Sequence, residues 1–273
     1  MAQPSARPEF SNLTLRILSA AVLLPLVVVV VWFGSWYFLT FVVLIGAAMG
    51  LEYSKLCGAG AIARGIITGA LATLPVMLFL AGPFAGLAWG AVCAILLMFY
   101  ILIRRSSDGV LLLIGTVYLS LGILAISWLR LVPEDGALTV FWIFAVVVGT
   151  DVGAYFAGRG IGGPKLAPRI SPSKTWAGLG GGMICAAAAG WSVGAFGAEN
   201  GSLNIALASG AFAVIAQIGD LLESALKRHC GVKDSGTLIP GHGGVLDRLD
   251  GYLSVAPVVV LLAIVSGESP LVW

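Results

Sequence analysis

The sequence has very little charge. Only 10% of its 273 residues are Asp, Glu, Lys or Arg, and 59% are hydrophobic. Because a soluble domain usually carries about a quarter charged residues, this composition excludes an ordinary soluble protein. Apolar runs of about 20 residues, the length that crosses a bilayer as one helix, recur along the chain. The sequence therefore predicts an all-α integral membrane protein with the lipid bilayer as its surroundings.

The sequence also lacks paired cysteines. None of its four cysteines forms a CxxC pair, which argues against a disulfide framework or a zinc knuckle. We interpret them as small apolar residues or reduced thiols: Cys57, Cys93, Cys185 and Cys230.

The apolar runs predict nine membrane spans. The first follows basic residues, as a signal peptide does, but it is long and has no A-x-A cleavage site, so we expect an uncleaved anchor. The predicted spans are 17–33, 36–53, 62–82, 84–103, 110–130, 139–158, 175–195, 203–226 and 252–267.

The basic residues predict the topology. If the N-terminus is cytoplasmic, only Arg130 of the 15 Lys and Arg residues falls outside the cytoplasmic segments. We therefore expect a multi-pass protein of the inner (plasma) membrane with a cytoplasmic N-terminus. Residues 1–138 would form about five N-terminal spans. Residues 139–273 would form a catalytic transmembrane region with two polar cytoplasmic loops, at 159–174 and 227–251.

Small residues recur four apart within the predicted spans. This spacing lets helix backbones approach closely in lipid, so we interpret it as helix packing rather than ligand binding. The pairs are Gly46/Gly50, Gly65/Gly69, Gly86/Gly90 and Gly178/Gly182.

Acidic residues lie inside two spans, where each costs roughly 2.5–3.5 kcal/mol on insertion scales. On the eighth span, Asp220, Glu223 and Lys227 fall on one helical stripe, together with Ser224. On the sixth, Asp151 shares a stripe with Tyr155. These stripes predict a polar cavity that opens to the cytoplasm, with a structural salt bridge between Asp220 and Lys227 as the alternative.

The loop after the sixth span combines glycines with basic and hydroxyl side chains. Its G-x-G-x-x-G pattern follows a membrane helix instead of a strand, which excludes a Rossmann site, and no G-K-[ST] follows, which excludes a Walker motif. The composition instead favours phosphate binding, and Ser173-Lys174-Thr175 is expected to open the seventh helix with its anion-attracting end. The candidate phosphate ligands are Lys165, Arg169, Ser171, Ser173 and Lys174.

The second loop supplies carboxylates. Asp247 and Asp250 are spaced i, i+3, with Asp234 upstream, and carboxylates with few soft ligands suit Mg²⁺ beside a substrate phosphate. Zinc held by His229, Cys230 and His242 is a weaker alternative, because the first two are adjacent and would diverge on a helix. Glycines around His242 indicate close backbone approach to a ligand: Gly241, Gly243 and Gly244. Phosphate-binding cations beside metal-binding carboxylates predict chemistry on a nucleotide or polyphosphate and a lipid.

The residues from Ser224 to Asp250 resemble the signature of phosphatidate cytidylyltransferases (CDP-diacylglycerol synthases) without a departure. The resemblance extends upstream through "ISPSKTW" and "DVGAYFAGR" and covers the C-terminal half of the chain. Two departures concern the first loop. The chain has Ile161-Gly162-Gly163-Pro164 where the family has Phe-Gly-Lys or Phe-Gly-Arg, and Ala177 where it usually has Glu.

The resemblance implies that CTP and phosphatidate give CDP-diacylglycerol and pyrophosphate. It implies Mg²⁺ on Asp220 and Asp247, with Asp250 in support and a second cation left open. The implied catalytic group is completed by Lys227, Arg228, Lys233, Asp234, His242 and Arg248. The implied substrate-binding group is Asp151, Tyr155, Ser171, Ser173, Lys174, Thr175, Ser224, Gly243 and Gly244. No nucleic acid is expected as a partner, and a homodimer is left open.

Three other functions can be weighed on the sequence. Asp247-x-x-Asp250-Gly251 fits the start of the CDP-alcohol phosphotransferase motif, but its continuation is missing, which excludes that family. A related CTP-dependent polyprenol or phytol kinase is the closest enzymatic alternative. A cation-coupled transporter would also place carboxylates within spans, although it does not require the dense polar loop.

Overall fold

The computed structural model describes residues 9–104, 108–197, 202–269 and 271. In this part of the chain, nine helices are long and apolar enough to cross a membrane, which confirms the predicted helical membrane fold. The helices are α1 (Glu9–Phe33), α2 (Ser35–Leu56), α3 (Ala61–Ala81), α4 (Pro83–Arg104), α5 (Gly109–Leu131), α6 (Gly136–Gly160), α7 (Trp176–Gly197), α8 (Ser202–His229) and α9 (Leu246–Ser266). Two short strands, β1 (Lys165–Ala167) and β2 (Ser171–Thr175), lie between α6 and α7.

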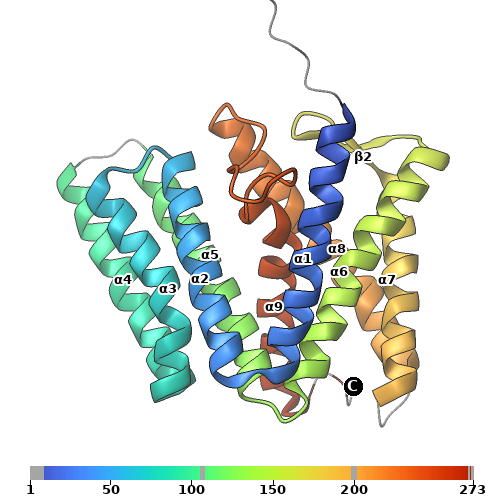
Figure 1. Ribbon diagram of the computed structural model, residues 1–273, viewed down its shortest axis with the longest axis horizontal. Coiled ribbons are helices and arrows are strands. Elements are labelled where there is room, and N and C mark those ends of the chain that lie inside the picture. The colour runs from blue at the N-terminus through green and yellow to red at the C-terminus, as the bar shows by residue number, and fades with distance from the viewer. Residues whose placement is uncertain (1–8, 105–107, 198–201, 270, 272–273) are drawn as a thin grey trace, which may run out of the picture.

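The helices form two groups that α9 joins. Figure 1 shows α2–α5 on one side and α6–α8 on the other, with α9 between them and α1 in front. One apolar cluster lies mainly among α2, α3 and α5 and takes in Leu253 of α9, whereas a second includes Val255 and Val259 of the same helix. The division of the chain at residue 138 stays a prediction, since α9 packs against both α5 and α8.

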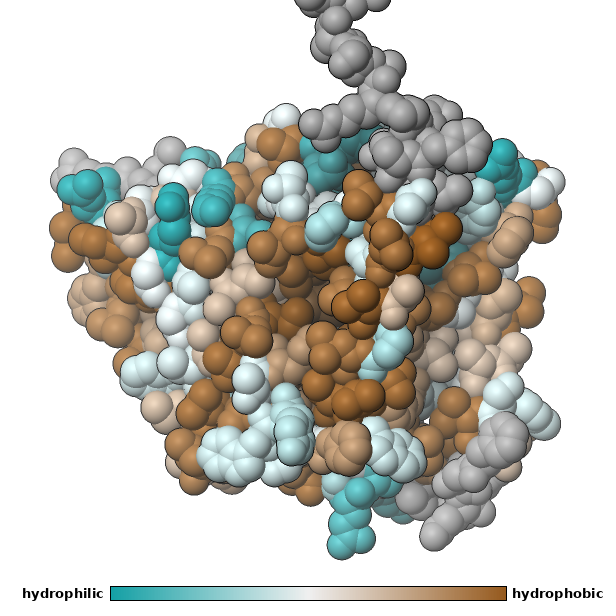
Figure 2. Space-filling view, in the orientation of Figure 1, coloured by the Kyte–Doolittle hydropathy of each residue, from teal (hydrophilic) through white to brown (hydrophobic). Residues whose placement is uncertain are grey.

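The outer surface is apolar around the middle of the bundle. Figure 2 shows hydrophobic side chains across the middle of one face and hydrophilic ones at its upper and lower edges. Large apolar side chains are exposed on the surface of the described helices, including Ile95 and Phe99 of α4 and Leu261 of α9. In water such a surface would be costly, whereas lipid tails cover it without penalty.

The polar connections gather at one end of the bundle. Figure 1 places the first turns of α1, the β1–β2 hairpin and the α8–α9 connection at the same end. Arg130, near the end of α5, lies at the other, where its guanidinium donates to the carbonyls of Val31 (2.5 Å) and Trp32 (3.0 Å). Arg7 and Arg105 lie outside the described residues. Which end faces the cytoplasm stays a prediction.

The ninth helix begins six residues earlier than its predicted start at residue 252. Leu246 is its first residue, so Asp247, Arg248 and Asp250 belong to its first turns and not to a loop. Hydropathy misplaces the start because these residues are polar, yet the side chain of Asp247 is buried among protein partners. The eighth helix likewise continues past 226 to His229.

The first polar loop contains an antiparallel hairpin that the sequence did not predict. Lys165 pairs with Thr175 and Ala167 with Ser171. The expectation that Ser173-Lys174-Thr175 opens a helix is therefore wrong, because α7 begins only at Trp176. The hydroxyl of Thr175 instead accepts a hydrogen bond from Gly178 N (3.0 Å), which satisfies one free amide of the first turn.

Three of the four predicted glycine pairs lie at helix contacts. A Cβ at Gly50 would lie 2.6 Å from Thr68 Cα, and one at Gly182 would lie 3.0 Å from the Thr150 carbonyl. Gly65 and Gly69 have nothing within 4 Å of such a Cβ, so the packing prediction is wrong for that pair.

All four cysteines are free. Cys57 follows α2 and Cys230 follows α8, both outside the membrane-spanning segments. Burial raises the pKa of the Cys57 thiol to about 12 and also raises the pKa of Cys230. Both therefore stay protonated near neutral pH, in agreement with their interpretation as inert thiols.

Candidate active site

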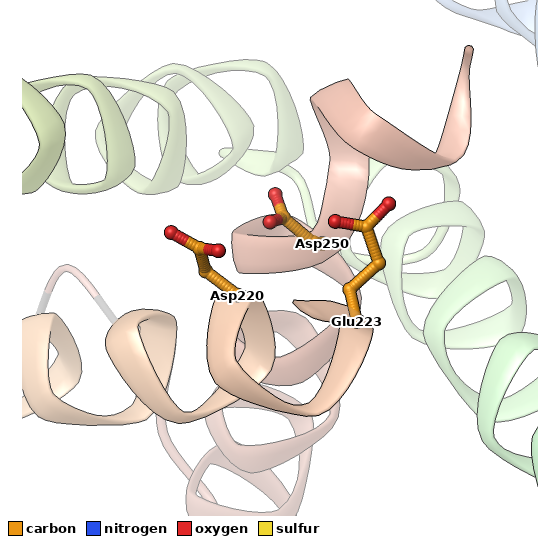
Figure 3. Close-up of side chains that lie close together, drawn as sticks. All are labelled: Asp220, Glu223 and Asp250. Carbon is orange, nitrogen blue, oxygen red and sulfur yellow. The ribbon is translucent and has the colours of Figure 1, made fainter. Parts of the chain in front are cut away.

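Three carboxylates from two helices point toward one another at the polar end of the bundle. Figure 3 shows Asp220 and Glu223, one turn apart on α8, facing Asp250 of α9. One oxygen from each lies within 4.8 Å of the others. The approach is close because Gly219 has no side chain: a Cβ there would lie 2.6 Å from the Asp250 carbonyl.

This carboxylate cluster has unfilled acceptor capacity. Glu223 Oε1 is buried and has no hydrogen-bond partner within the described part of the chain. Buried acceptors normally find a donor or a cation. Three half-buried carboxylates with an orphaned oxygen therefore suit a hard cation such as Mg²⁺, which takes oxygen ligands.

Two lysines connect the cluster to the surrounding elements. Lys174 of β2 places its Nζ 2.5 Å from Asp220 Oδ2, an ion pair without hydrogen-bond geometry. Lys227 of α8 bridges Glu223 Oε2 at 2.9 Å and Asp247 Oδ1 at 2.7 Å. The lysine side chains are only 13% and 14% exposed. The alternative salt bridge between Asp220 and Lys227 is not found.

Asp247 lies on the other side of Lys227 from the carboxylate cluster, and both of its oxygens have protein partners. Oδ2 accepts from Ser235 N (3.0 Å), Ser235 Oγ (2.9 Å) and Gly244 N (2.9 Å), while Oδ1 meets Lys227. A Cβ at Gly243, whose φ is +85°, would lie 2.9 Å from Oδ2. The expectation that Asp247 shares a metal ion with Asp220 stays a prediction, but its oxygens are already well satisfied.

A pocket of about 300 Å³ opens beside Asp220. It gathers most of the substrate-binding residues predicted from the sixth span and the first loop, although Ser171 is not among its lining residues. The lining residues are Asp151, Ala154, Tyr155, Gly158, Arg159, Ser173, Lys174, Thr175, Gly178, Gln217 and Asp220. Since Asp220 belongs to both, the pocket and the carboxylate cluster form one continuous polar site.

The remaining predicted residues surround this site. Arg228 donates to the Ile170 carbonyl of the hairpin (3.5 Å), and Ser224 Oγ donates to Asp220 Oδ1 (3.3 Å). Arg248 donates from Nε and Nη2 to the His242 carbonyl at 3.0 and 2.8 Å. In the α8–α9 connection, Lys233 and Asp234 are both exposed.

The zinc alternative finds no support in the described residues. His229 Nε2 lies 4.0 Å from Asp108, whereas His242 Nδ1 contacts Ser19 Oγ at 2.7 Å. Neither histidine belongs to the group of possible metal ligands found there, which consists of carboxylates.

Residues of the N-terminal half reach this site, which the sequence did not predict. Arg16 Nε donates to the Gly241 carbonyl (2.9 Å), and Glu52 Oε2 accepts from Leu246 N (3.1 Å). Glu52 carries a signal that could have revealed it, since it is an acidic residue within a predicted span. Ser19 and Arg16 carry no such signal.

Ala177, which stands where the family usually has Glu, does not line the polar pocket that contains Lys174. Ala177 lines a separate apolar groove between α6 and α7 with Phe156 and Ile184. A glutamate at this position would therefore enter apolar surroundings, and not the polar pocket next to Asp220.

Comparisons with known proteins agree with the resemblance. The model of the cytidylyltransferase family matches residues 14–265. A phosphatidate cytidylyltransferase of Brucella suis biovar 1 is 38% identical over 268 residues, which cover 94% of this chain and 96% of the relative. The protein of the same name from Mycobacterium leprae is 44% identical over 126 residues, 46% of this chain and 40% of that one. That from Staphylococcus haemolyticus is 40% identical over 160 residues, 58% of this chain and 60% of the relative.

Proposed function

The chain belongs to the cytidylyltransferase family, and on this basis we propose how its residues carry out the reaction. It is a multi-pass membrane enzyme, a nucleotidyltransferase that transfers the cytidylyl group of CTP to phosphatidate and so makes CDP-diacylglycerol for phospholipid synthesis.

The reaction exchanges one P–O bond for another. A phosphate oxygen of phosphatidate attacks the α-phosphorus of CTP, and the bond from that phosphorus to the bridging oxygen breaks as pyrophosphate leaves. The attacking oxygen is already anionic, so no covalent protein intermediate is required. The protein contributes by positioning the two phosphates and by neutralising the charge that grows on pyrophosphate.

The contact between Lys174 and Asp220 is the observation that supports this assignment best. It joins a phosphate-binding cation to a metal-binding carboxylate at the edge of one pocket. We propose that an incoming phosphate takes over Lys174, together with Arg159 and Ser173 of the same pocket. Asp220, released from Lys174, would then be available as one of the residues that hold a cation.

We propose that Mg²⁺ is held by Asp220, Glu223 and Asp250. The supporting facts are their mutual distance below 4.8 Å and the orphaned Glu223 Oε1. When bound, such an ion would supply positive charge next to the phosphates of CTP. Asp247 remains a candidate ligand of the same or a second cation.

The cations next to the carboxylates neutralise the substrates. Lys227 lies between Glu223 and Asp247. We propose that its ammonium group donates a hydrogen bond to a phosphate oxygen while it keeps its ion pairs with both carboxylates. Arg228 and Lys233 are exposed, and we propose that their charge guides anionic substrates toward the site.

We also propose that the site faces the cytoplasm across the inner membrane. The bacterial origin of the relatives and the basic residues in the last turns of α2, α4, α6 and α8 support this orientation. A homodimer remains open.

Labelled CTP tests the reaction and its alternatives. We expect purified enzyme in phospholipid micelles to move label from the α-phosphate of CTP into chloroform-soluble product only when phosphatidate is present. Label from the γ-phosphate should stay in the aqueous phase. Transfer of γ-label to lipid would instead establish a polyprenol or phytol kinase, and no transfer of either would favour a transporter.

The variant Lys174→Met tests the proposed site within the same assay. It removes the ammonium next to Asp220 and should lower kcat/KM about a hundredfold, a loss of about 2.7 kcal/mol of transition-state stabilisation. Lys55→Met removes an exposed lysine at the end of α2 and should leave kcat/KM within about twofold. Equal effects of the two variants would contradict the role of Lys174.

A further inference from the structure

The segment between α8 and α9 is built around a carboxylate from the second helix. Glu52 is only 7% exposed, and its Oε2 accepts a hydrogen bond from Leu246 N at 3.1 Å. The two residues are 194 positions apart in the chain. Leu246 is the first residue of α9, and the helix has no side-chain cap from its own N-cap residue, Val245. Glu52 therefore caps α9 from another helix.

Two glycines of this segment fit against the same carboxylate. A Cβ at Gly236 would lie 2.5 Å from Glu52 Oε1, and one at Gly244 would lie 2.7 Å from Oε2. Both contacts are closer than side-chain carbons tolerate, so the segment closes on Glu52 with bare backbone. The carboxylate and the backbone of this segment are therefore in direct contact at both glycines, and a side chain at either position would force the segment or the end of the Glu52 side chain to move.

The same short segment holds Asp247 on its other side. Gly244 packs against the Glu52 carboxylate, and its N–H donates a hydrogen bond to Asp247 Oδ2 at 2.9 Å. Ser235, directly before Gly236, donates to the same oxygen from its N–H and its hydroxyl. A shift of the segment by a fraction of an ångström would weaken all three hydrogen bonds and turn Asp247 relative to Lys227.

The Glu52 carboxylate also stabilises the N-terminus of α9 electrostatically. The first amides of a helix lack partners within the helix, and its N-terminus carries a partial positive charge that a carboxylate stabilises. Because α9 begins with Leu246, whose N–H is buried against Glu52, loss of the acceptor would leave a buried donor unpaired. The structure would have to move to find another partner.

On the basis of the role assigned to Asp247 in the proposed function, we propose that Glu52 is a positioning residue of the enzyme. Its carboxylate fixes the Ser235–Leu246 segment so that Asp247 keeps Oδ1 directed at Lys227. Glu52 does not touch the polar pocket and acts only through this segment.

A series of Glu52 variants tests this role. Glu52→Gln keeps an acceptor of the same length and should retain kcat within about threefold. Glu52→Leu fills similar space without an acceptor and should lower kcat at least about tenfold, with KM for CTP changed by less than about threefold. Ser54→Ala serves as the matched control, because Ser54 is buried on the same helix but donates to Leu51 of its own helix.

Hydrogen exchange supplies a readout that does not depend on turnover. In Glu52→Leu, amides of the peptide 234–247 should exchange at least about tenfold faster, while peptides of α3 and α4 keep their protection. In Glu52→Gln the peptide should stay protected. Wild-type kcat and protection in Glu52→Leu, or equal losses in the Gln and Leu variants, would overturn the proposal.

A second approach remains informative if Glu52→Leu does not fold. Gly236→Ala should displace the segment through its contact with Glu52, and adding Glu52→Asp, which shortens the side chain but keeps the carboxylate, should restore part of the protection of the peptide 234–247. Gly65→Ala, at a glycine with nothing within 4 Å, is the control and should change nothing. No displacement in Gly236→Ala, or no restoration in the double variant, would contradict the contact.

The two proposals fail in different ways. Wild-type enzyme without CDP-diacylglycerol synthesis would refute the proposed function whatever Glu52 does. Normal wild-type turnover with a fully active Asp247→Asn variant would refute the role of Asp247. In both cases the exchange data would still decide whether Glu52 holds the segment.

Discussion

The carboxylates of Asp220, Glu223 and Asp250 repel one another at distances below 4.8 Å, unless a cation or protons lie between them. Lys174 contacts Asp220 and Lys227 contacts Glu223, whereas no ion pair to Asp250 is found within the described residues. At the scale of single residues, the electrostatics of the site are therefore incomplete without a further positive charge.

Magnesium dependence tests which carboxylates hold the ion. We expect Asp220→Asn, Glu223→Gln and Asp250→Asn each to raise the Mg²⁺ concentration for half-maximal activity at least about tenfold, because each removes an oxygen ligand. Asp247→Asn should lower kcat about a hundredfold through Lys227 while leaving that concentration within about twofold.

The Asp220→Asn/Asp247→Asn double variant distinguishes a metal ion held by Asp220, Glu223 and Asp250 from the ion that the sequence analysis expects on Asp220 and Asp247. If the two aspartates share a metal ion, Asp247→Asn should also raise the Mg²⁺ requirement, and the double variant should be little worse than either single one. Thermal unfolding gives a check without turnover: Mg²⁺ at 100 times its Kd should stabilise the wild type by about 2.7 kcal/mol. A stabilisation that survives in Asp250→Asn would exclude that residue as a ligand.

At the scale of elements, α1 is attached to the active site by its polar end. It packs against α2 and α6. Near its start, Arg16 donates to Gly241 and Ser19 contacts His242, both in the α8–α9 connection, while at its other end the carbonyls of Val31 and Trp32 accept from Arg130 of α5. The Ser19 hydroxyl also lies 3.1 Å from the Arg16 carbonyl. Because a hydroxyl has one proton, donation to that carbonyl leaves it to accept from His242 Nδ1–H, which sets the histidine tautomer.

The variant Ser19→Ala tests this attachment. It removes the partner of His242 Nδ1 and should lower kcat about three- to tenfold, while Ser19→Thr, which keeps the hydroxyl, should restore most of the activity. Ser192→Ala removes an exposed hydroxyl on α7 that bonds only to its own helix, and should have no effect. Activity of Ser19→Ala equal to that of Ser192→Ala would mean that α1 contributes nothing through this contact.

At the scale of the whole molecule, the charges divide the bundle into two ends. Basic residues lie in the last turns of α2, α4, α6 and α8, whereas Arg130 lies in the last turn of α5, which ends at the opposite side of the bundle. Basic residues next to spans stay in the cytoplasm, so this division predicts that the active site is reached from inside the cell.

Cysteine labelling tests the orientation. In an otherwise cysteine-free protein, Ser173→Cys should resist a membrane-impermeant maleimide in intact cells and react after permeabilisation. Glu134→Cys, exposed between α5 and α6, should react in intact cells. The reverse pattern would place the active site outside and contradict the predicted topology.

The sequence by itself determined the membrane class, the number of spans and the reaction family. Hydropathy is a local property that adds up along a segment, so nine apolar runs are visible without knowledge of their packing. Spacing also predicts neighbours on one helix, as with Glu223 and Lys227, which are four residues apart and form an ion pair. The signature from Ser224 to Asp250 identified the polar segment of the site.

Only the tertiary structure decided which polar residues meet across elements. Glu52 meets Leu246 and Ser19 meets His242 at separations of 194 and 223 residues, and these contacts depend on how the helices pack, which spacing along the chain does not encode. Packing at Gly219 likewise brings Asp250 to Asp220 and leaves Asp247 with Lys227 and Ser235. The early start of α9 has the same origin, because Lys227 of α8 and residues of the α8–α9 connection satisfy the polar residues that hydropathy assigns to a loop.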